Sequence, residues 1–170
     1  MRPLLAISRA IDGVNALIGR AVSWLILVAV LVSAGNAISR KAFSLASNAW
    51  LELQWYLFGA AFLLAAAYTL QRDEHIRIDI VSNALPQRVR DWIDIIGHAF
   101  VLIPFTGFMV YQCWPFFYSA FRSGEVSGSY GGLPLWPANL IILAGFFLLL
   151  LQAISELIKR LALVFGEAGS

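Results

Sequence analysis

Four long apolar runs alternate with short polar segments along this chain of 170 residues. The runs cover about residues 21–39, 50–70, 92–121 and 134–158. A helix of about 20 predominantly apolar residues crosses the roughly 30 Å hydrocarbon core of a bilayer, and each run has about this length or more. The pattern predicts an all-α integral membrane protein with four transmembrane helices, organised as a single membrane domain over residues 1–170.

The first 20 residues have a pattern of their own. Their apolar side chains fall mostly on one side of a helix, which is typical of an amphipathic helix lying along a membrane surface. A disordered leader is the alternative. The apolar run that follows is longer than the core of a cleavable signal peptide and ends before Arg40-Lys41, so we expect a retained first helix. The apolar positions are Leu4, Leu5, Ile7, Ile11, Val14, Leu17 and Ile18, and the charged positions elsewhere are Arg9, Asp12 and Arg20.

The third apolar run predicts an unusually long helix. Pro86 suits a helix start, because the N–H that proline lacks has no helical partner in the first turn. A continuous helix from Pro86 to Phe121 would be about 54 Å long, well beyond the hydrocarbon core. We therefore expect it to tilt or to begin outside the membrane, and Pro104 can bend it.

The fourth run follows a link rich in Ser and Gly, residues 122–133, which predicts turns and loop. Pro134 and Pro137 suit the start of a helix, and Lys159-Arg160 suit its end at a headgroup boundary. The fourth span is therefore expected to end near residue 158.

Composition supports a membrane protein. Hydrophobic residues make up 60% of the chain and charged residues 13%, and the mean hydropathy is +0.77. A soluble domain would carry about 25% charged residues. No basic run suits a nucleic-acid backbone, and the single cysteine, Cys113, excludes an intrachain disulfide. The lipid bilayer is therefore the expected surroundings.

The distribution of Lys and Arg predicts the orientation. Four spans place both termini and the link 71–91 on one side, and the two shorter links on the other. Nine basic residues lie on the first side and three on the second, so the positive-inside rule places both termini and the link 71–91 in the cytoplasm. The nine are Arg2, Arg9, Arg20, Arg72, Arg77, Arg88, Arg90, Lys159 and Arg160, and the three are Arg40, Lys41 and Arg122.

The link 71–91 begins with an ionic segment, Arg72 to Ile80. Its isoleucines alternate with His75, Arg77 and Asp79, which favours an extended strap with one apolar side. Arg77 and Asp79 would then bond to helix ends, in this chain or in a partner. The alternative is a solvated loop whose charges only anchor the topology.

Ionisable groups near the membrane point to function, because they are costly there. Glu52 lies about one turn inside the second span, where it either reaches water or pairs with another subunit. Asp94 and His98 are spaced i, i+4, so we expect them to share a helix face and hydrogen-bond. Gln112 and Gln152 are expected to hydrogen-bond between helices.

No phosphate loop, nucleophile elbow or HExxH sequence occurs, so the sequence offers no catalytic, metal or cofactor site. The main alternative function is the membrane anchor of a respiratory redox complex. Such anchors commonly hold haem between two histidines on facing helices, whereas His98 is the one histidine within a predicted span. A haem held by one copy of the chain is therefore disfavoured.

The sequence resembles the small membrane subunit, DctQ-like, of tripartite ATP-independent periplasmic (TRAP) transporters, over about residues 20–160. The resemblance rests on Glu52, the span after it, and Arg72-x-x-His75-Ile76-Arg77-Ile78-Asp79 followed by Leu85-Pro86. The segment Gly131-Gly132-Leu133-Pro134-x-Trp136-Pro137 is similar to the branch that handles 2-oxo acids or related organic acids.

The resemblance implies two protein partners in a bacterial inner membrane, a large permease subunit and a periplasmic substrate-binding protein. It implies uptake of an organic acid driven by a sodium gradient, with substrate and sodium sites in the large subunit, which this chain would scaffold. Candidate residues for subunit contact or structure are Glu52, Arg72, His75, Arg77, Asp79, Asp94 and His98. Candidates for docking the binding protein are Arg40, Lys41, Arg122, Glu125 and Trp136.

Overall fold

A computed structural model describes residues 2–43, 48–72 and 86–167 of the chain. In these ranges four helices are long and apolar enough to cross a membrane, which confirms the predicted all-helical membrane fold. The elements are α1 (Arg2–Phe43), α2 (Asn48–Gln71), α4 (Gln87–Ile96), the π-helical segment η1 (Gly97–Leu102), α5 (Ile103–Ser123) and α6 (Trp136–Glu167). The third spanning helix is continuous through α4, η1 and α5.

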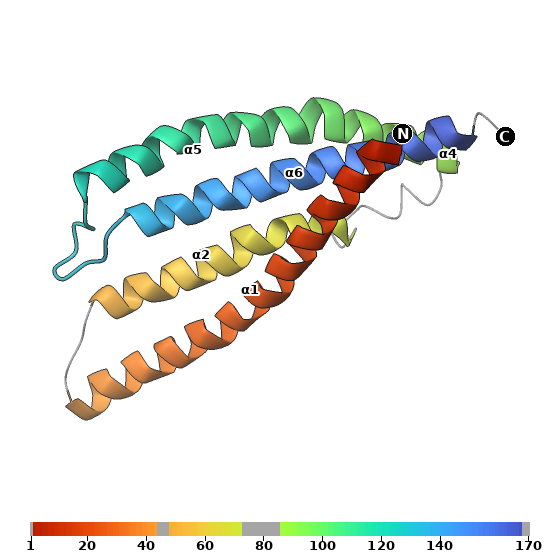
Figure 1. Ribbon diagram of the computed structural model, residues 1–170. Coiled ribbons are helices and arrows are strands. Elements are labelled where there is room, and N and C mark those ends of the chain that lie inside the picture. The colour runs from red at the N-terminus through yellow and green to blue at the C-terminus, as the bar shows by residue number, and fades with distance from the viewer. Residues whose placement is uncertain (1, 44–47, 73–85, 168–170) are drawn as a thin grey trace.

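The helices form a bundle in which α6 contacts all the others. Figure 1 shows the order α5, α6, α2, α1 across the molecule. Both termini lie at one end, called here the termini end, together with α4 and the last turn of α2. The loop 124–135 between α5 and α6, the last turn of α1 and the first turn of α2 lie at the other end, called here the loop end. Which end faces the cytoplasm stays a prediction.

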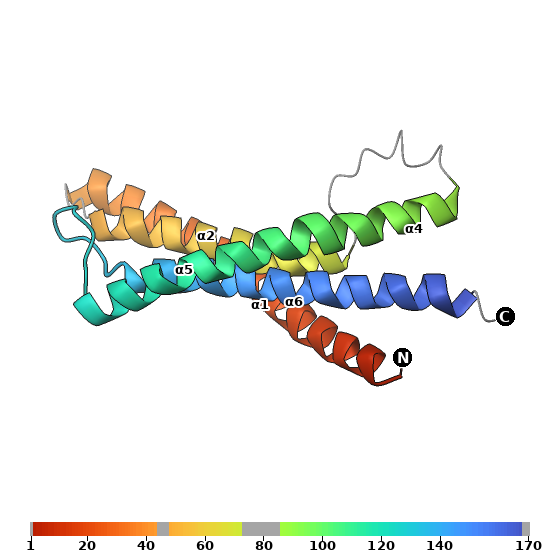
Figure 2. The same ribbon diagram turned by 90° about the horizontal axis from the view of Figure 1, so that it is seen from above.

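Helix α1 runs without a break for 42 residues, about 63 Å. The amphipathic segment 1–20 and the first predicted span are therefore one helix rather than two. In Figure 2, α1 crosses α6 near the middle of the bundle, and polar residues from the first turns of α1 hydrogen-bond to α6. That residues 1–20 lie along the membrane surface stays a prediction.

A buried polar seam joins α1 to α6 at this crossing. The Ser8 and Ser155 hydroxyls are 2.7 Å apart, and the Asn15 amide donates to Gln152 Oε1 at 2.7 Å. Gln152 Nε2 donates in turn to Asp12 Oδ1 at 2.8 Å. Ser8, Asp12 and Asn15 follow helical spacing, so all three project from one side of α1. The expected role of Gln152 in joining helices is confirmed.

Two glycines bring the helices close together. A Cβ added at Gly19 of α1 would lie 2.4 Å from the Tyr68 ring of α2, and one at Gly145 of α6 would lie 2.8 Å from Leu63 Cβ. Small residues at such contacts let helices approach closely in lipid, where dispersion packing replaces the hydrophobic drive. Any larger residue at either position would have to push α2 away.

The long third helix is confirmed, and its irregularity lies just before Pro104. Gly97 to Leu102 are π-helical, and the Ile103 N–H bonds to the His98 carbonyl five residues earlier. Proline has no N–H to donate, and its ring crowds the carbonyl four residues before it, so a wider turn accommodates it. The helix arches over this region in Figure 1, as expected for a bend near Pro104.

Helix α6 continues to Glu167, past the predicted end of the fourth span near residue 158, and where this span leaves the membrane stays a prediction. The Lys159 ammonium group lies 3.1 Å from Asp12 Oδ2 on α1. The Arg160 guanidinium lies 3.3 Å from a carboxylate oxygen of Asp91 and 3.3 Å from one of Asp94, both on α4. These partners let α6 extend between its neighbours beyond the apolar run.

The seam predicts a stability effect for Gln152→Leu. The substitution removes the partner of the buried Asn15 amide and one donor to Asp12, so the free energy of unfolding should fall by about 1–2 kcal/mol. Denaturant titration of the purified chain in detergent micelles measures it. Gln112→Leu is the matched control, because Gln112 is exposed on α5. An equal decrease in the free energy of unfolding in the two variants would contradict the role of the seam in stability.

Candidate functional site at the loop end

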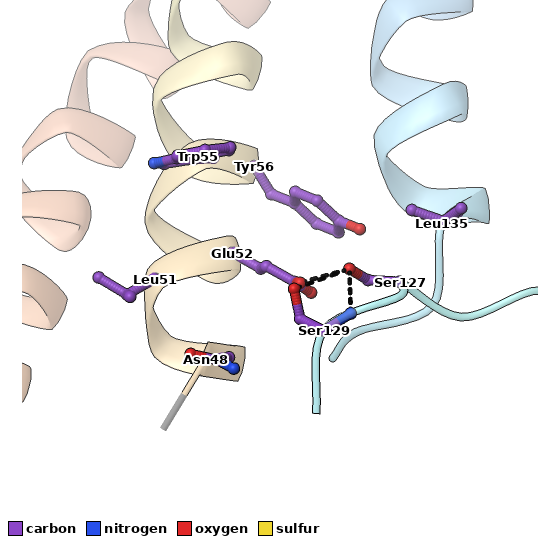
Figure 3. A pocket seen from close by; sticks show the side chains of 8 residues that line it. All are labelled: Asn48, Leu51, Glu52, Trp55, Tyr56, Ser127, Ser129 and Leu135. Atoms are coloured by element: carbon purple, nitrogen blue, oxygen red, sulfur yellow. Dashed lines mark hydrogen bonds between the residues drawn. The ribbon is translucent and has the colours of Figure 1, made fainter. Parts of the chain in front are cut away.

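Glu52 joins α2 to the loop 124–135. It lies about one turn after Asn48, where α2 begins, and its carboxylate points toward the loop in Figure 3. Oε1 accepts a hydrogen bond from the Ser127 hydroxyl, and Oε2 accepts one from the Leu133 N–H at 2.7 Å. Both oxygens therefore bond to the loop of the same chain. Contact with another subunit, as the sequence suggested for Glu52, stays a prediction.

The loop is closed by its own main chain as well. The Ser127 N–H donates to the Leu133 carbonyl at 2.9 Å, and the Leu135 N–H donates to the Glu125 carbonyl at 2.9 Å. Gly124 and Gly131 have φ values of 62° and 70°, in the left-handed region that favours glycine. The Ser- and Gly-rich link is therefore a folded cap with two defined turns, and Glu52 binds across it.

Further contacts attach this cap to the first turns of α2. The Tyr56 hydroxyl donates to the Pro134 carbonyl at 3.0 Å, and the Asn48 amide donates to the Tyr130 carbonyl at 3.3 Å. A pocket of about 370 Å³ lies between α2 and the cap. Figure 3 shows its lining residues, which are Asn48, Leu51, Glu52, Trp55, Tyr56, Ser127, Ser129 and Leu135.

The arrangement at the loop end is one of support rather than catalysis. The hydrogen bonds from Ser127 and the Leu133 N–H stabilise the charged form of Glu52, which makes its carboxylate a weaker base. Across the described parts of the chain, no group of three or more His, Cys, Asp or Glu side chains could hold a metal ion.

The five candidate docking residues all lie near the loop end, but in two separate groups. Arg40 and Lys41 are exposed in the last turn of α1. Arg122 and Glu125 are exposed where α5 leads into the cap, and Trp136 begins α6. Figure 1 places the end of α1 and the end of α5 at opposite edges of the bundle.

Trp136 and Arg122 also have structural contacts. The Trp136 ring meets the Phe121 ring edge to face, with 5.8 Å between centroids, so Trp136 helps to hold α6 against α5. The Arg122 guanidinium lies over the Tyr118 ring at 5.5 Å. Arg122 still presents its charge at the surface.

At the termini end, the predicted hydrogen bond between the Asp94 and His98 side chains is wrong. His98 Nδ1 bonds to the main-chain carbonyl of Asp94 at 2.7 Å, while the Asp94 carboxylate pairs with Arg160 of α6. The two residues do share a helix face. The Arg160 guanidinium offers the Asp94 carboxylate a permanent positive charge and a strong donor.

Only the first residue of the ionic segment is described. Arg72 follows α2, and its guanidinium donates to the Tyr68 hydroxyl at 2.9 and 2.7 Å. His75, Arg77 and Asp79 lie outside the described residues. The strap and the solvated loop therefore both stay predictions.

Sequence reasoning missed Asp12 and the cap residues that bond to Glu52. Asp12 was treated only as a charge on an amphipathic helix. A usable signal existed, since Ser8, Asp12 and Asn15 repeat at helical spacing. Nothing in the sequence marks the Leu133 N–H as a partner of Glu52, because every non-proline residue has the same main-chain donor.

Comparison with known proteins found one family match. A family model described as "Tripartite ATP-independent periplasmic transporters, DctQ component" matches residues 28–163. No curated protein and no solved structure matched the chain. The matched range includes Glu52, the cap, all of α2, α4, η1 and α5, most of α6, and residues 28–43 of α1.

Glu52→Ala is expected to loosen the cap. The Leu133 N–H loses a charged acceptor, and hydrogen bonds to charged groups are worth about 1.5–3 kcal/mol, so its amide exchange should speed up about tenfold or more. Hydrogen–deuterium exchange with mass spectrometry measures the peptide containing Leu133. Glu125→Ala is the control, because Glu125 bonds to Leu135 within the cap through its main-chain carbonyl, which the substitution leaves in place. If the Leu133 amide exchanged at the wild-type rate in Glu52→Ala, the role of Glu52 in holding the cap would be contradicted.

Proposed function

Because the chain belongs to the DctQ component family of tripartite ATP-independent periplasmic transporters, we propose that it scaffolds a large permease subunit and helps to dock a periplasmic binding protein. The family makes it a small permease subunit of a TRAP transporter, a non-enzymatic and multi-pass membrane protein. The family also supports the bacterial inner membrane as its location.

A scaffold role is supported by how the bundle is held together. In the described residues, the polar seam with its ion pairs ties the helices at the termini end, and Glu52 with the cap ties them at the loop end. The spanning surface between these ends is largely apolar and exposed, on α1, α2 and α5 alike. A bundle tied at both ends offers a firm apolar surface to lipid and to a partner in the membrane.

Sodium-coupled uptake of an organic acid is part of the proposal. It rests on the resemblance of the ionic segment and of residues 131–137 to the sequences of such transporters, and it assigns the substrate and sodium sites to the large subunit. The polar groups of the seam support this assignment, because they bond to one another between α1 and α6.

The redox anchor is the less favoured function. The family match is to a transporter component, and His98 is the only histidine that the described spanning helices contain. A haem held by two histidines of one copy would also require His75, outside the predicted spans.

Co-purification tests the assignment. An affinity-tagged chain co-expressed with the large permease of the same transporter should retain the permease through solubilisation in mild detergent, as mass spectrometry of the eluate would show. A chain recovered alone, or one recovered with haem absorbance and without permease, would contradict the proposed function.

If the binding protein docks at the loop end, reversing a charge there should weaken its binding. Arg122→Glu should weaken binding of the purified binding protein to the transporter in nanodiscs by up to about fivefold, and less at high salt, because exposed charge pairs are weak and screened. Interferometry at two salt concentrations measures it. Arg9→Glu is the control, since Arg9 is exposed at the termini end. Equal weakening in both variants would argue against docking at the loop end.

A further inference from the structure

The outer side of α5 has an open notch that a single helix forms. It measures about 610 Å³, and its lining comes from consecutive turns of α5 alone, namely Gly107, Val110, Tyr111, Gln112, Trp114 and Pro115. Helix α6 packs against another side of α5, where the Phe105 and Phe146 rings meet edge to face. Among the described residues, α5 therefore lines the notch on one side, and no second helix covers it.

The notch is lined mainly by apolar groups, but it contains one amide side chain, that of Gln112, at a depth where lipid offers no hydrogen bonds. Gln112 lies 11 residues before Ser123, the end of α5, so it is about 16 Å along the helix from the loop end, near the middle of a 30 Å hydrocarbon core. Its side chain is exposed, and it makes no hydrogen bond with the described residues, so the helix–helix bond expected for Gln112 is not formed among them. An unpaired amide at this depth is costly, and a polar side chain of another helix relieves the cost.

A main-chain carbonyl that lacks its usual α-helical donor lies in the same notch. Pro115 is inside α5 and has no N–H, so it supplies no hydrogen bond to the Tyr111 carbonyl four residues earlier. The Tyr111 side chain, 75% exposed, lies beside it. The notch thus offers an amide and a carbonyl to a donor that approaches from outside the chain.

The shape of the notch favours a helix as its occupant. Gly107 forms part of the floor, and a Cβ built there meets nothing within 4 Å. The backbone of an approaching helix can come close to α5 at such a position, as small residues allow in membranes. A lipid chain would fill the space but would leave Gln112 and the Tyr111 carbonyl unpaired.

We propose that this notch receives a transmembrane helix of the large permease subunit, packed over Gly107 and hydrogen-bonded through its own polar side chain to Gln112. The inference rests on the proposed function, which supplies the partner, and adds the face of the bundle that the partner covers. The permease helix provides the missing wall of the notch, and α5 becomes the central helix of the contact.

The open space at Gly107 makes a clean test. A Cβ built at Gly107 meets nothing within 4 Å, so Gly107→Leu should fold, whereas its side chain would occupy the space of the partner helix. Overpacking of this kind is expected to reduce co-purified permease about tenfold or more. Gln112→Leu should reduce it about three- to tenfold through the lost hydrogen bond.

Gly35→Leu is the matched control. Gly35 is exposed on α1 and its added Cβ also meets nothing within 4 Å, but it lies on the opposite edge of the bundle from α5. It should retain permease at the wild-type level. Equal retention by all three variants, or equal loss in Gly107→Leu and Gly35→Leu, would overturn the inference. Failure of the wild-type chain to retain permease would instead overturn the proposed function.

A photo-crosslinking amino acid identifies the occupant directly. Placed at Tyr111 in the co-expressed complex, it should yield a covalent product with the permease, whereas the same group at Leu31, exposed on α1, should not. A product that contains two copies of this chain would replace the permease by a second copy as the occupant and overturn the inference. Products with lipid alone would also overturn it.

Discussion

Asp12 is where three helices of this bundle are joined, and the fold at the termini end depends on it. Its carboxylate accepts hydrogen bonds from Gln152 and Ser155 and pairs with Lys159, all on α6. Its main-chain carbonyl accepts a bond from the Gln71 amide at the end of α2. Lipid tails are as apolar as leucine, so burial of apolar surface does little to drive helices together in a bilayer. Polar contacts that lipid cannot replace therefore select which helix faces meet.

The need to pair polar groups that lipid cannot satisfy also explains the loop end and the side of α5 that no other helix of the described chain covers. Glu52 converts a loop of small residues into a cap with a defined shape, because both carboxylate oxygens have donors in it. On α5, Gln112 makes no side-chain hydrogen bond among the described residues, and the Tyr111 carbonyl lacks the donor that a residue other than Pro115 would supply. The satisfied polar groups between helices hold the subunit together, whereas the exposed amide of Gln112 supports the proposed contact with another subunit.

This division fits a subunit whose role is to support rather than to transport. The charges of the termini end are paired between helices, with Arg160 between two carboxylates of α4. The exposed charges of the loop end lie at its rim, where they can meet a soluble protein, while the notch of α5 lies within the span. One small bundle can thus contact a membrane partner and a soluble partner through separate surfaces.

The sequence by itself determined the four spans, the long third helix, its irregularity near Pro104 and the importance of Glu52 and Gln152. These follow from local properties: the length of apolar runs, the missing N–H of proline and the cost of a polar side chain at depth. Only the tertiary structure decided that Asp94 pairs with Arg160 instead of His98, that α6 continues past Lys159, and that Glu52 binds its own cap. Each of these depends on which faces of distant segments meet, as Ser8 and Ser155 do across 147 positions. Hydropathy measures how each residue partitions between water and lipid. Which residue it contacts depends instead on the shapes and polar groups of the two surfaces that pack together.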